Sequence, residues 1–479
     1  MINKRTIYAG LLALTMCFSA YGQSTQGELW TLEECVNYAW ENNLTVRTNE
    51  LNQRQNEINL KEAKFSRLPD LSGRGSVGQQ FGRTINPNTN EFTSNDVIGG
   101  SMSLNSSVTL YRGGQILNTI KRNELDLKAS GYDLEKAKND IGLTVATNFL
   151  NVLLNREQLS NARFQLQVTQ EQLERTKKLV EAGSLPMTNQ LDLESQEASN
   201  QVQVVNAENN LNLSMLNLKQ AMQMPAQESL DIVAPDVEVG QLSSVSQNPN
   251  EIYQIALANQ PDIKSADLGI ESGALGIKIA KAAFLPSLTL SGSISSNFSD
   301  AAQTGSNIQP FLVPIGEVEG TNQTVFTERN LPTVFEDTPF FTQVDNNLGQ
   351  SIGFGINVPI FNRYSNSASL QRAQITKQRA EITALNTRNT LRQNIETAYN
   401  NALASLKSYE ATEKRVEALA ESFRVVEQQY NAGGANFTDY QVASNNLFAA
   451  RADLVRTKYE YIFRTKILDF YLGNPLTLK

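Results

Sequence analysis

The sequence predicts an α+β membrane protein, a trimeric α/β-barrel to which each protomer contributes four transmembrane β-strands and long coiled-coil helices. Three observations lead to this fold class. The chain carries an internal duplication, it contains two very long helical segments without proline, and it has four alternating strands of membrane-crossing length.

The composition argues against an enzyme and against a nucleic-acid partner. The 479 residues include no histidine, the commonest general base and metal ligand, and only two cysteines. The sequence contains no G-x-x-x-x-G-K-[ST] phosphate-binding loop, and no carboxylate pair stands out from the helix-surface charges. Acidic residues outnumber basic ones, 49 against 41, so the chain lacks the basic balance that nucleic acids favour. We therefore expect a non-enzymatic protein with no cofactor and no metal.

Residues 1–22 have the pattern of a secretory signal peptide. Two basic residues precede an apolar run, and Ala20 and Gly22 supply small side chains at the cleavage site. A lipoprotein signal at Cys17 is the alternative, which the bulky residue before it disfavours. The mature chain keeps Cys35 alone and carries a net charge of about −10. Because no later run of 18 apolar residues exists, the exported chain can enter a membrane only as a β-barrel.

The two halves of the chain repeat each other. Residues 34–71 match 251–288 at an offset of 217, and from about residue 103 the offset becomes 250. The second half therefore carries about 33 extra residues, which lie in the acidic loop of its strand pair. We expect a first structural repeat over 23–235 and a second over 236–479. Each repeat runs helix, two strands, long helix, break, helix.

The two longest predicted helices span about 115–181 and about 365–431. Each is about 67 residues long, roughly 100 Å at 1.5 Å per residue, and apolar side chains recur along it at steps of three and four. A second helix follows each break, which gives long helix pairs over 115–225 and 365–472. Polar side chains cover much of the remaining surface, as in a soluble bundle or in a channel wall with water on both sides.

Four strands form two predicted β-hairpins over 71–110 and 286–361, and they alternate apolar with small polar side chains. We predict that the apolar side chains face lipid and that the small polar ones face water. The lipid-facing residues in the second hairpin are Leu290, Ile352, Phe354, Ile356 and Val358. A soluble β-sandwich also alternates, but it would place charges where these strands have small polar residues.

Four strands are too few to close a barrel, for which about eight is the smallest workable number. The chain must therefore share its barrel with copies of itself. Two copies would leave an interior filled by side chains, whereas three would give twelve strands and begin to leave a lumen. Three copies are the better fit to a conduit.

Several short motifs occur in a fixed order along the chain. LP-x-L appears at 68–71 and at 285–288 before a strand, and LYRGG at 110–114 ends one. The closing stretch at 431–473, NAGGANFTDYQVASNNLFAARADLVRTKYEYIFRTKILDFYLG, is the most specific. This ordered set resembles the TolC family of outer-membrane efflux and secretion channels, and the resemblance covers nearly all of the mature chain.

The resemblance implies a homotrimer with a twelve-stranded barrel in the outer-membrane lipid and helices that reach through the periplasm of a Gram-negative bacterium. It also implies that the helical tips dock onto a periplasmic adaptor (membrane fusion) protein, which an inner-membrane pump serves. Residues 225–250, together with the C-terminus, would form a small equatorial region.

A glycine-containing break separates the helices of each pair. Gly183 and Gly433 lie at corresponding positions, and we expect positive φ at both, in helix-to-helix turns. Thr188 and Thr438 follow at the start of the next helices, where a hydroxyl group can cap free backbone N–H groups. The resemblance implies that these four residues lie at the adaptor-docking tips.

The same resemblance implies a pore entrance just beyond the turns. Asp439 occupies the position of a family acid that narrows and guards the pore, and Asn189 is its counterpart in the first repeat. Asp192 lies one level deeper in the first repeat, whereas Val442 replaces the deeper family acid in the second. The helix dipole also favours an acid near a helix N-terminus, so a purely structural role for Asp439 is the alternative.

The predicted function is a passive exit duct of a tripartite efflux or type I secretion system, energised by a partner pump. The alternative is a non-conducting periplasmic coiled-coil scaffold or adhesin. The sequence leaves open the exported substrate, the class of pump, the role of the acidic insertion and the open or closed resting state.

Overall fold

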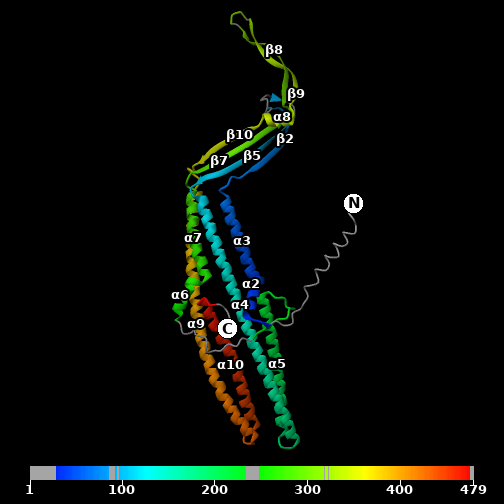
Figure 1. The fold of residues 1–479 in the computed structure, drawn as a ribbon, viewed down its shortest axis with the longest axis vertical. Coiled ribbons are helices and arrows are strands. Elements are labelled where there is room, and N and C mark those ends of the chain that lie inside the picture. Colours follow the sequence, from blue (N-terminus) through cyan, green and yellow to red (C-terminus); the bar gives the residue numbers. More distant parts are fainter. Residues whose placement is uncertain are drawn as a thin grey trace, which may run out of the picture. The chain divides into compact units, whose positions relative to one another are not determined.

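A computed structural model describes residues 29–85, 92–93, 96–233, 248–317, 319–321 and 323–474 of the chain (Figure 1). The predicted signal peptide, Cys17 and part of the predicted 225–250 linker lie outside the described residues. The chain divides into two compact units. The first holds residues up to 57, 126–270 and those from 379, and the second holds 58–125 and 271–378. Each unit therefore contains corresponding segments of both sequence repeats.

The helices are α2 (Leu32–Asn42), α3 (Leu44–Phe65), α4 (Gln115–Glu181), α5 (Met187–Met222), α6 (Pro249–Asn259), α7 (Pro261–Ala282), α8 (Phe340–Asn346), α9 (Ser365–Asn431) and α10 (Phe437–Tyr471). The strands are β1 (Leu29–Trp30), β2 (Ser72–Gln80), β3 (Thr84–Ile85), β4 (Phe92–Thr93), β5 (Val97–Arg112), β6 (Asp231–Ile232), β7 (Ser287–Ser299), β8 (Gln303–Glu317), β9 (Thr324–Asp337) and β10 (Gly349–Asn357). Within the described part of the chain, every helix is too short or too polar to cross a membrane.

The helix boundaries reproduce the duplication. The bounds of α2 and α3 reappear as those of α6 and α7 at the offset of 217, and those of α4 as α9 at the offset of 250. α4 and α9 are each 67 residues long and have the predicted bounds. The duplication inferred from the sequence therefore extends to the start and end of these helices.

The one helix predicted before each strand pair is in fact two helices. α2 ends just before Asn43, whose extended backbone stops the helix and whose Oδ1 accepts the Thr45 N–H at 2.8 Å. α6 ends just before Gln260, which is also extended, because Pro261 disfavours helical geometry in the residue before it. Both breaks have local causes that the sequence contains, but the helical spacing continues across them.

The two repeats bury equivalent side chains in the first unit. The first core includes Val145 and Leu218, which pack with residues of α2 and β6. The second core includes Ile395 and Leu468, which occupy the same positions at the offset of 250 and pack with residues of α6. The apolar stripes of the long helices thus pack against the short helix that begins their own repeat.

The larger sheet lies in the second unit and has the strand order β10-β7-β5-β2 (Figure 1). Each neighbouring pair is antiparallel, so the predicted hairpins are present as β2–β5 and β7–β10 and meet along β5 and β7. β2 and β10 are the outer strands. Among the described residues, no strand pairs with the outer edge of either.

The insertion in the second repeat is not the loop that the sequence predicted. β8 and β9 form a separate antiparallel hairpin, and α8 follows it. Both strands are rich in the β-branched and aromatic residues that favour strands, and their prolines are tolerated because each strand has a free edge. The Thr338 N–H donates to the Ala302 carbonyl at 2.9 Å, which joins the two ends of the hairpin.

Candidate functional site

The turns at Gly183 and Gly433 have the same backbone geometry. The φ angle is 72° at Gly183 and 77° at Gly433, as predicted from the glycine pattern. The Gly433 N–H donates to the Tyr430 carbonyl at 3.1 Å, and the Gly434 N–H donates to the Gln429 carbonyl at 2.8 Å. The first turn repeats this pair of bonds, so both helices end in a Schellman motif, which occupies otherwise free carbonyls.

The capping role predicted for Thr188 and Thr438 is wrong. α10 is capped by Asn436, whose Oδ1 accepts the Asp439 N–H at 2.8 Å. At α5 the cap position is Pro186, which forms no side-chain cap bond. Both threonines are exposed and lie inside the first helical turn, beyond the cap positions.

An aromatic cluster ties the two helix pairs together near the turns. Phe437 and Tyr440 of α10 are buried with Leu173 of α4 and Leu193 of α5. The rings of Tyr430 and Tyr440 are stacked with centroids 5.0 Å apart. Burial raises the pKa of the Tyr440 hydroxyl to about 12. The cluster fixes the start of α10 and hence the direction of the residues beside Tyr440.

The predicted pore-entrance residues lie at the surface of this region. Asp439 and Asp192 are exposed, and Asn189 is half-buried. Val442, one turn beyond Asp439, is 54% exposed. The Asp439 carboxylate has no ion pair or hydrogen bond with another described residue, so none of those residues neutralises its charge.

A chain of amide and hydroxyl hydrogen bonds joins α10, α5 and α4. Gln441 donates to Gln196 at 3.1 Å, and Gln196 donates to Asn200 at 2.9 Å. Asn200, which is buried, then donates to the Thr169 hydroxyl at 2.8 Å. These residues could not be recognised from the sequence, because nothing in a polar helical sequence distinguishes a buried amide from a solvated one.

The sheet in the second unit has two chemically different faces. Leu290 lies directly opposite Phe354 on one side and Val108 on the other, and Ile356 lies opposite Leu288. On the other face Ser291 lies between Gly353 and Ser107. Hydroxyl pairs continue this polar face across the strands, at 2.9 Å between Ser293 and Ser351 and between Ser76 and Ser101. The register therefore continues the predicted alternation across neighbouring strands.

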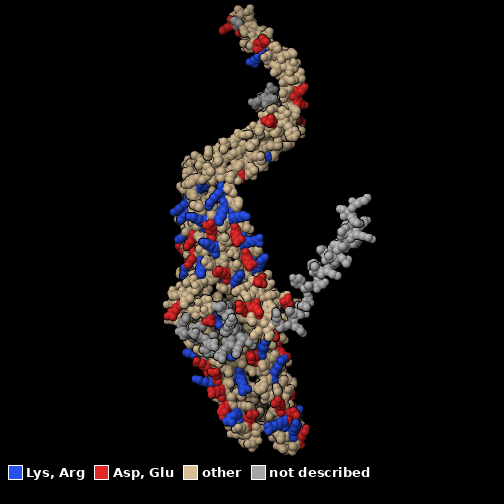
Figure 2. Space-filling model, viewed as in Figure 1, with Lys and Arg blue, Asp and Glu red and all other residues tan. Residues whose placement is uncertain are grey.

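The apolar residues predicted on β10 are exposed: Ile352 is 80% exposed, and Phe354 and Ile356 are each 72% exposed. Val358 is exposed too, but it lies just beyond the end of β10. Charged residues are almost absent from the four strands, which contain only Arg74 and Arg112. Figure 2 shows the same contrast, since charged side chains crowd the helices and are sparse over the sheet.

A bulge shifts the register near the end of β5. The pairing with β7 is irregular between Thr109 and Tyr111, so Tyr111 lies opposite Leu288. Strict alternation from Val108, which lies opposite Leu290, would place Leu110 in that register. The bulge also puts Arg112 opposite Ser287, on the polar face of the sheet.

Known proteins share this sequence pattern and this fold. Residues 36–222 and 252–474 match the family model described as outer membrane efflux protein. The chain belongs to the outer membrane efflux protein family. Its break between matched segments falls at the junction of the two repeats, so the family match covers both halves of the duplication.

Individual relatives of this efflux protein are distant but cover much of the chain. The outer membrane efflux protein BepC of Brucella suis biovar 1 is 21% identical over 444 residues, which are 92% of this chain and 84% of BepC. The outer membrane protein TolC of Escherichia coli K12 is 22% identical over 333 residues, 69% of this chain and 61% of TolC. The solved structure of CusC, studied for transmembrane channel formation, superposes with a TM-score of 0.73 at 18% identity and covers 95% of this chain and 96% of CusC.

The family match and these relatives confirm the predicted fold class, outer-membrane location and efflux-channel function of the chain. The family is one of channels and not of enzymes. The efflux protein therefore works by providing a path.

Proposed function

We propose that three copies of this efflux protein join their four-stranded sheets into one twelve-stranded outer-membrane barrel and form a passive exit duct. The observation that carries the proposal is the sheet with an apolar face, a serine- and glycine-rich face and two outer edges that pair with no strand among the described residues. Neighbouring strands alternate in direction, so β2 of one copy can pair antiparallel with β10 of the next. Closing the barrel removes the free edges, and three copies leave room for a lumen.

The helix turns are the second part of the proposal. The four turn residues are all exposed: Gly183, Thr188, Gly433 and Thr438. A Cβ on either glycine would meet no atom within 4 Å, so this surface can bind a periplasmic adaptor protein. Asp439, with Asp192 and Asn189, lines the entrance just beyond these turns. An inner-membrane pump supplies the energy, in a tripartite efflux or type I secretion system.

Ion conductance through planar lipid bilayers tests the duct. The purified protein should give discrete, stable conductance steps, because water-filled lumens of three-chain barrels carry ions. A bilayer that contains the inserted protein but shows no conductance would rule the duct out and favour the non-conducting scaffold or adhesin. A heat-denatured sample of the same preparation is the matched control.

A further inference from the structure

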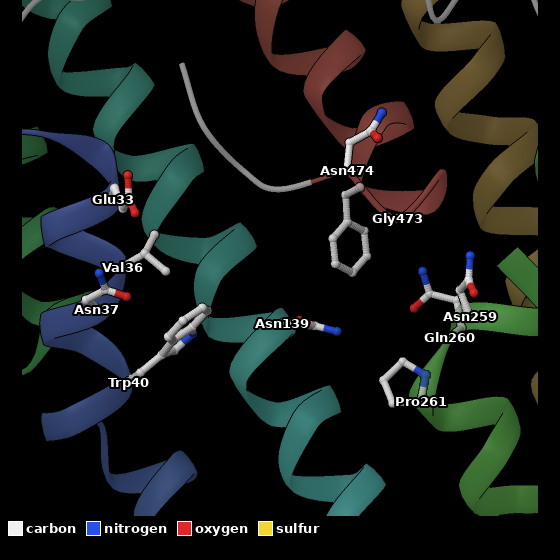
Figure 3. Close-up of a pocket in the computed structure, with 11 residues that line it drawn as sticks. Glu33, Val36, Asn37, Trp40, Asn139, Asn259, Gln260, Pro261, Gly473 and Asn474 are labelled. Carbon is white, nitrogen blue, oxygen red and sulfur yellow. The ribbon is translucent and has the colours of Figure 1, made fainter. Parts of the chain in front are cut away.

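A cavity of about 370 Å³ lies within the first unit (Figure 3). Its walls come from α2, α4, the break between α6 and α7, and the C-terminal end of α10. This volume is within the range of small-molecule binding pockets. Figure 3 shows Trp40 and Asn139 on one side of the cavity, across from Gln260 and Pro261.

The first repeat fills the corresponding positions with its own side chains. Asn43 donates its amide to the Ala221 carbonyl at 3.1 Å, and Met224 is buried in the first core. At the offsets of the duplication, Gln260 replaces Asn43 and Asn474 replaces Met224. Gln260 makes no equivalent bond to α10 among the described residues.

The backbone at the two helix ends is the same, so the difference lies in the side chains. Gln223 and Gly473 both have positive φ, 60° and 87°. The Met224 N–H donates to the Lys219 carbonyl at 2.8 Å, and the Asn474 N–H donates to the Asp469 carbonyl at 3.0 Å. Met224 fills the first core with an apolar side chain, whereas its counterpart Asn474 places an amide beside the cavity.

Five amide side chains line the cavity: Asn37, Asn139, Asn259, Gln260 and Asn474. No side-chain hydrogen bond joins any of the five to another described residue. Gln260 is only 9% exposed. Asn37, Asn259 and Asn474 are exposed and Asn139 is half-buried, so a ligand that enters the cavity must replace water on these amides. A molecule that both donates and accepts hydrogen bonds can replace that water.

The remaining walls restrict the chemistry of that ligand. The Trp40 indole N–H already donates to the Lys138 carbonyl at 2.8 Å, so the ring offers the cavity an apolar surface. Pro261 and Val36 extend this apolar surface, and among the described residues that line the cavity only Glu33 has an ionisable side chain. Hydroxyl groups match amides as donors and acceptors, and the C–H faces of a sugar ring pack on aromatic rings. We propose that this cavity binds a neutral saccharide.

Calorimetric titration of the full-length protein tests the proposal, in a detergent without a sugar headgroup such as lauryldimethylamine oxide. The probes are three neutral disaccharides, maltose, cellobiose and N,N′-diacetylchitobiose, with glucosamine and glucuronate as charged comparisons. At least one neutral disaccharide should bind saturably with a dissociation constant of about 1 mM or lower. Asn139→Leu should weaken that binding by about tenfold, because it removes one amide.

Asn389→Leu is the matched control, since Asn389 is the counterpart of Asn139 in the second repeat and is exposed away from the cavity. Asn474→Met, which restores the residue of the first repeat, should also weaken binding by about tenfold while the helical circular dichroism stays unchanged. Absence of saturable binding by every neutral disaccharide would overturn the proposal. Equal affinity in the Asn139 and Asn389 variants, or tighter binding of glucosamine than of the neutral sugars, would overturn it as well.

Discussion

Gly433 and Gly434 are neighbours in one turn, but only Gly433 has a positive φ. A Cβ on Gly433 would meet no atom within 4 Å, so a side chain there would be penalised through the backbone alone. A Cβ on Gly434 would lie 3.6 Å from the Gln429 carbonyl oxygen, an ordinary contact. A substitution at Gly433 therefore tests the need for positive φ, whereas one at Gly434 tests only whether the turn has room for a side chain.

Gly433→Ala should lower the free energy of unfolding by about 1 kcal/mol, because alanine is strained at positive φ. Gly434→Ala, in the same turn, should change it by less than about 0.5 kcal/mol. Thermal unfolding followed by circular dichroism measures both changes. Equal losses in the two variants would mean that the turn requires small residues for packing rather than glycine for its backbone.

Asp439→Asn should lower the cation preference of the channel and leave thermal stability nearly unchanged. Three unpaired carboxylates around an entrance would attract cations and repel anions, and the substitution removes charge without changing size. Asp192→Asn should act in the same direction but more weakly. Reversal potentials across a salt gradient measure the preference.

Asn436→Ala is the control for the structural role of this helix start. It removes the hydrogen bond that caps α10 and should cost about 1 kcal/mol of stability without altering ion selectivity. If Asp439→Asn instead destabilises the protein and leaves the reversal potential unmoved, the carboxylate serves the helix dipole and not the pore.

At the scale of elements, the sheet combines strands from both repeats. Phe354, Leu290 and Val108 stand in one row across three strands, and Gly353, Ser291 and Ser107 stand in the neighbouring row on the other face. A shift of one strand by one residue would move its apolar side chains to the polar face of the sheet and its polar side chains to the apolar face. The register therefore reinforces the chemical separation of the faces.

Ile356→Arg and Leu290→Arg should impair membrane insertion, because a charge that faces lipid near the midplane costs about 2 to 4 kcal/mol. Asn357→Arg and Ser291→Arg, each one residue further along the same strand, should be tolerated, since their side chains lie on the polar face. Outer-membrane fractionation measures the inserted amount. Equal damage by both members of each pair would show that the apolar face is not against lipid.

At the scale of the whole molecule, one chain cannot complete its own sheet. The outer edges of β2 and β10 have no strand partner among the described residues. An unpaired edge strand can pair with a strand of another chain. Because each copy has the same two edges, every copy can pair with the next in the same way. A closed ring of copies satisfies every edge.

The detergent-extracted protein should therefore be a trimer of roughly 150 kDa, because the chain is about 53.0 kDa before loss of its predicted signal and twelve strands require three copies. Light scattering coupled to size-exclusion chromatography, corrected for bound detergent, measures the mass. A monodisperse monomer that retains its β-sheet circular dichroism would contradict the shared barrel.

The sequence by itself determined the features that depend on local spacing. The scarcity of glycine and the absence of proline predicted α4 and α9 with their observed bounds, and the glycines at 183 and 433 predicted turns with positive φ. Alternation assigned the faces of β7 and β10. Each of these patterns involves residues that lie close together in the sequence, so it can be recognised without the folded structure.

Only the tertiary structure decided the features that depend on distant residues or on a shift of one position. Asn436 and not Thr438 caps α10, and the bulge in β5 places Tyr111 where strict alternation would place Leu110. The cavity needs Trp40, Asn139, Gln260 and Asn474, which are far apart in the sequence. Helix packing brings these residues together. Packing depends on many weak contacts between distant parts of the chain, which no short stretch of sequence contains.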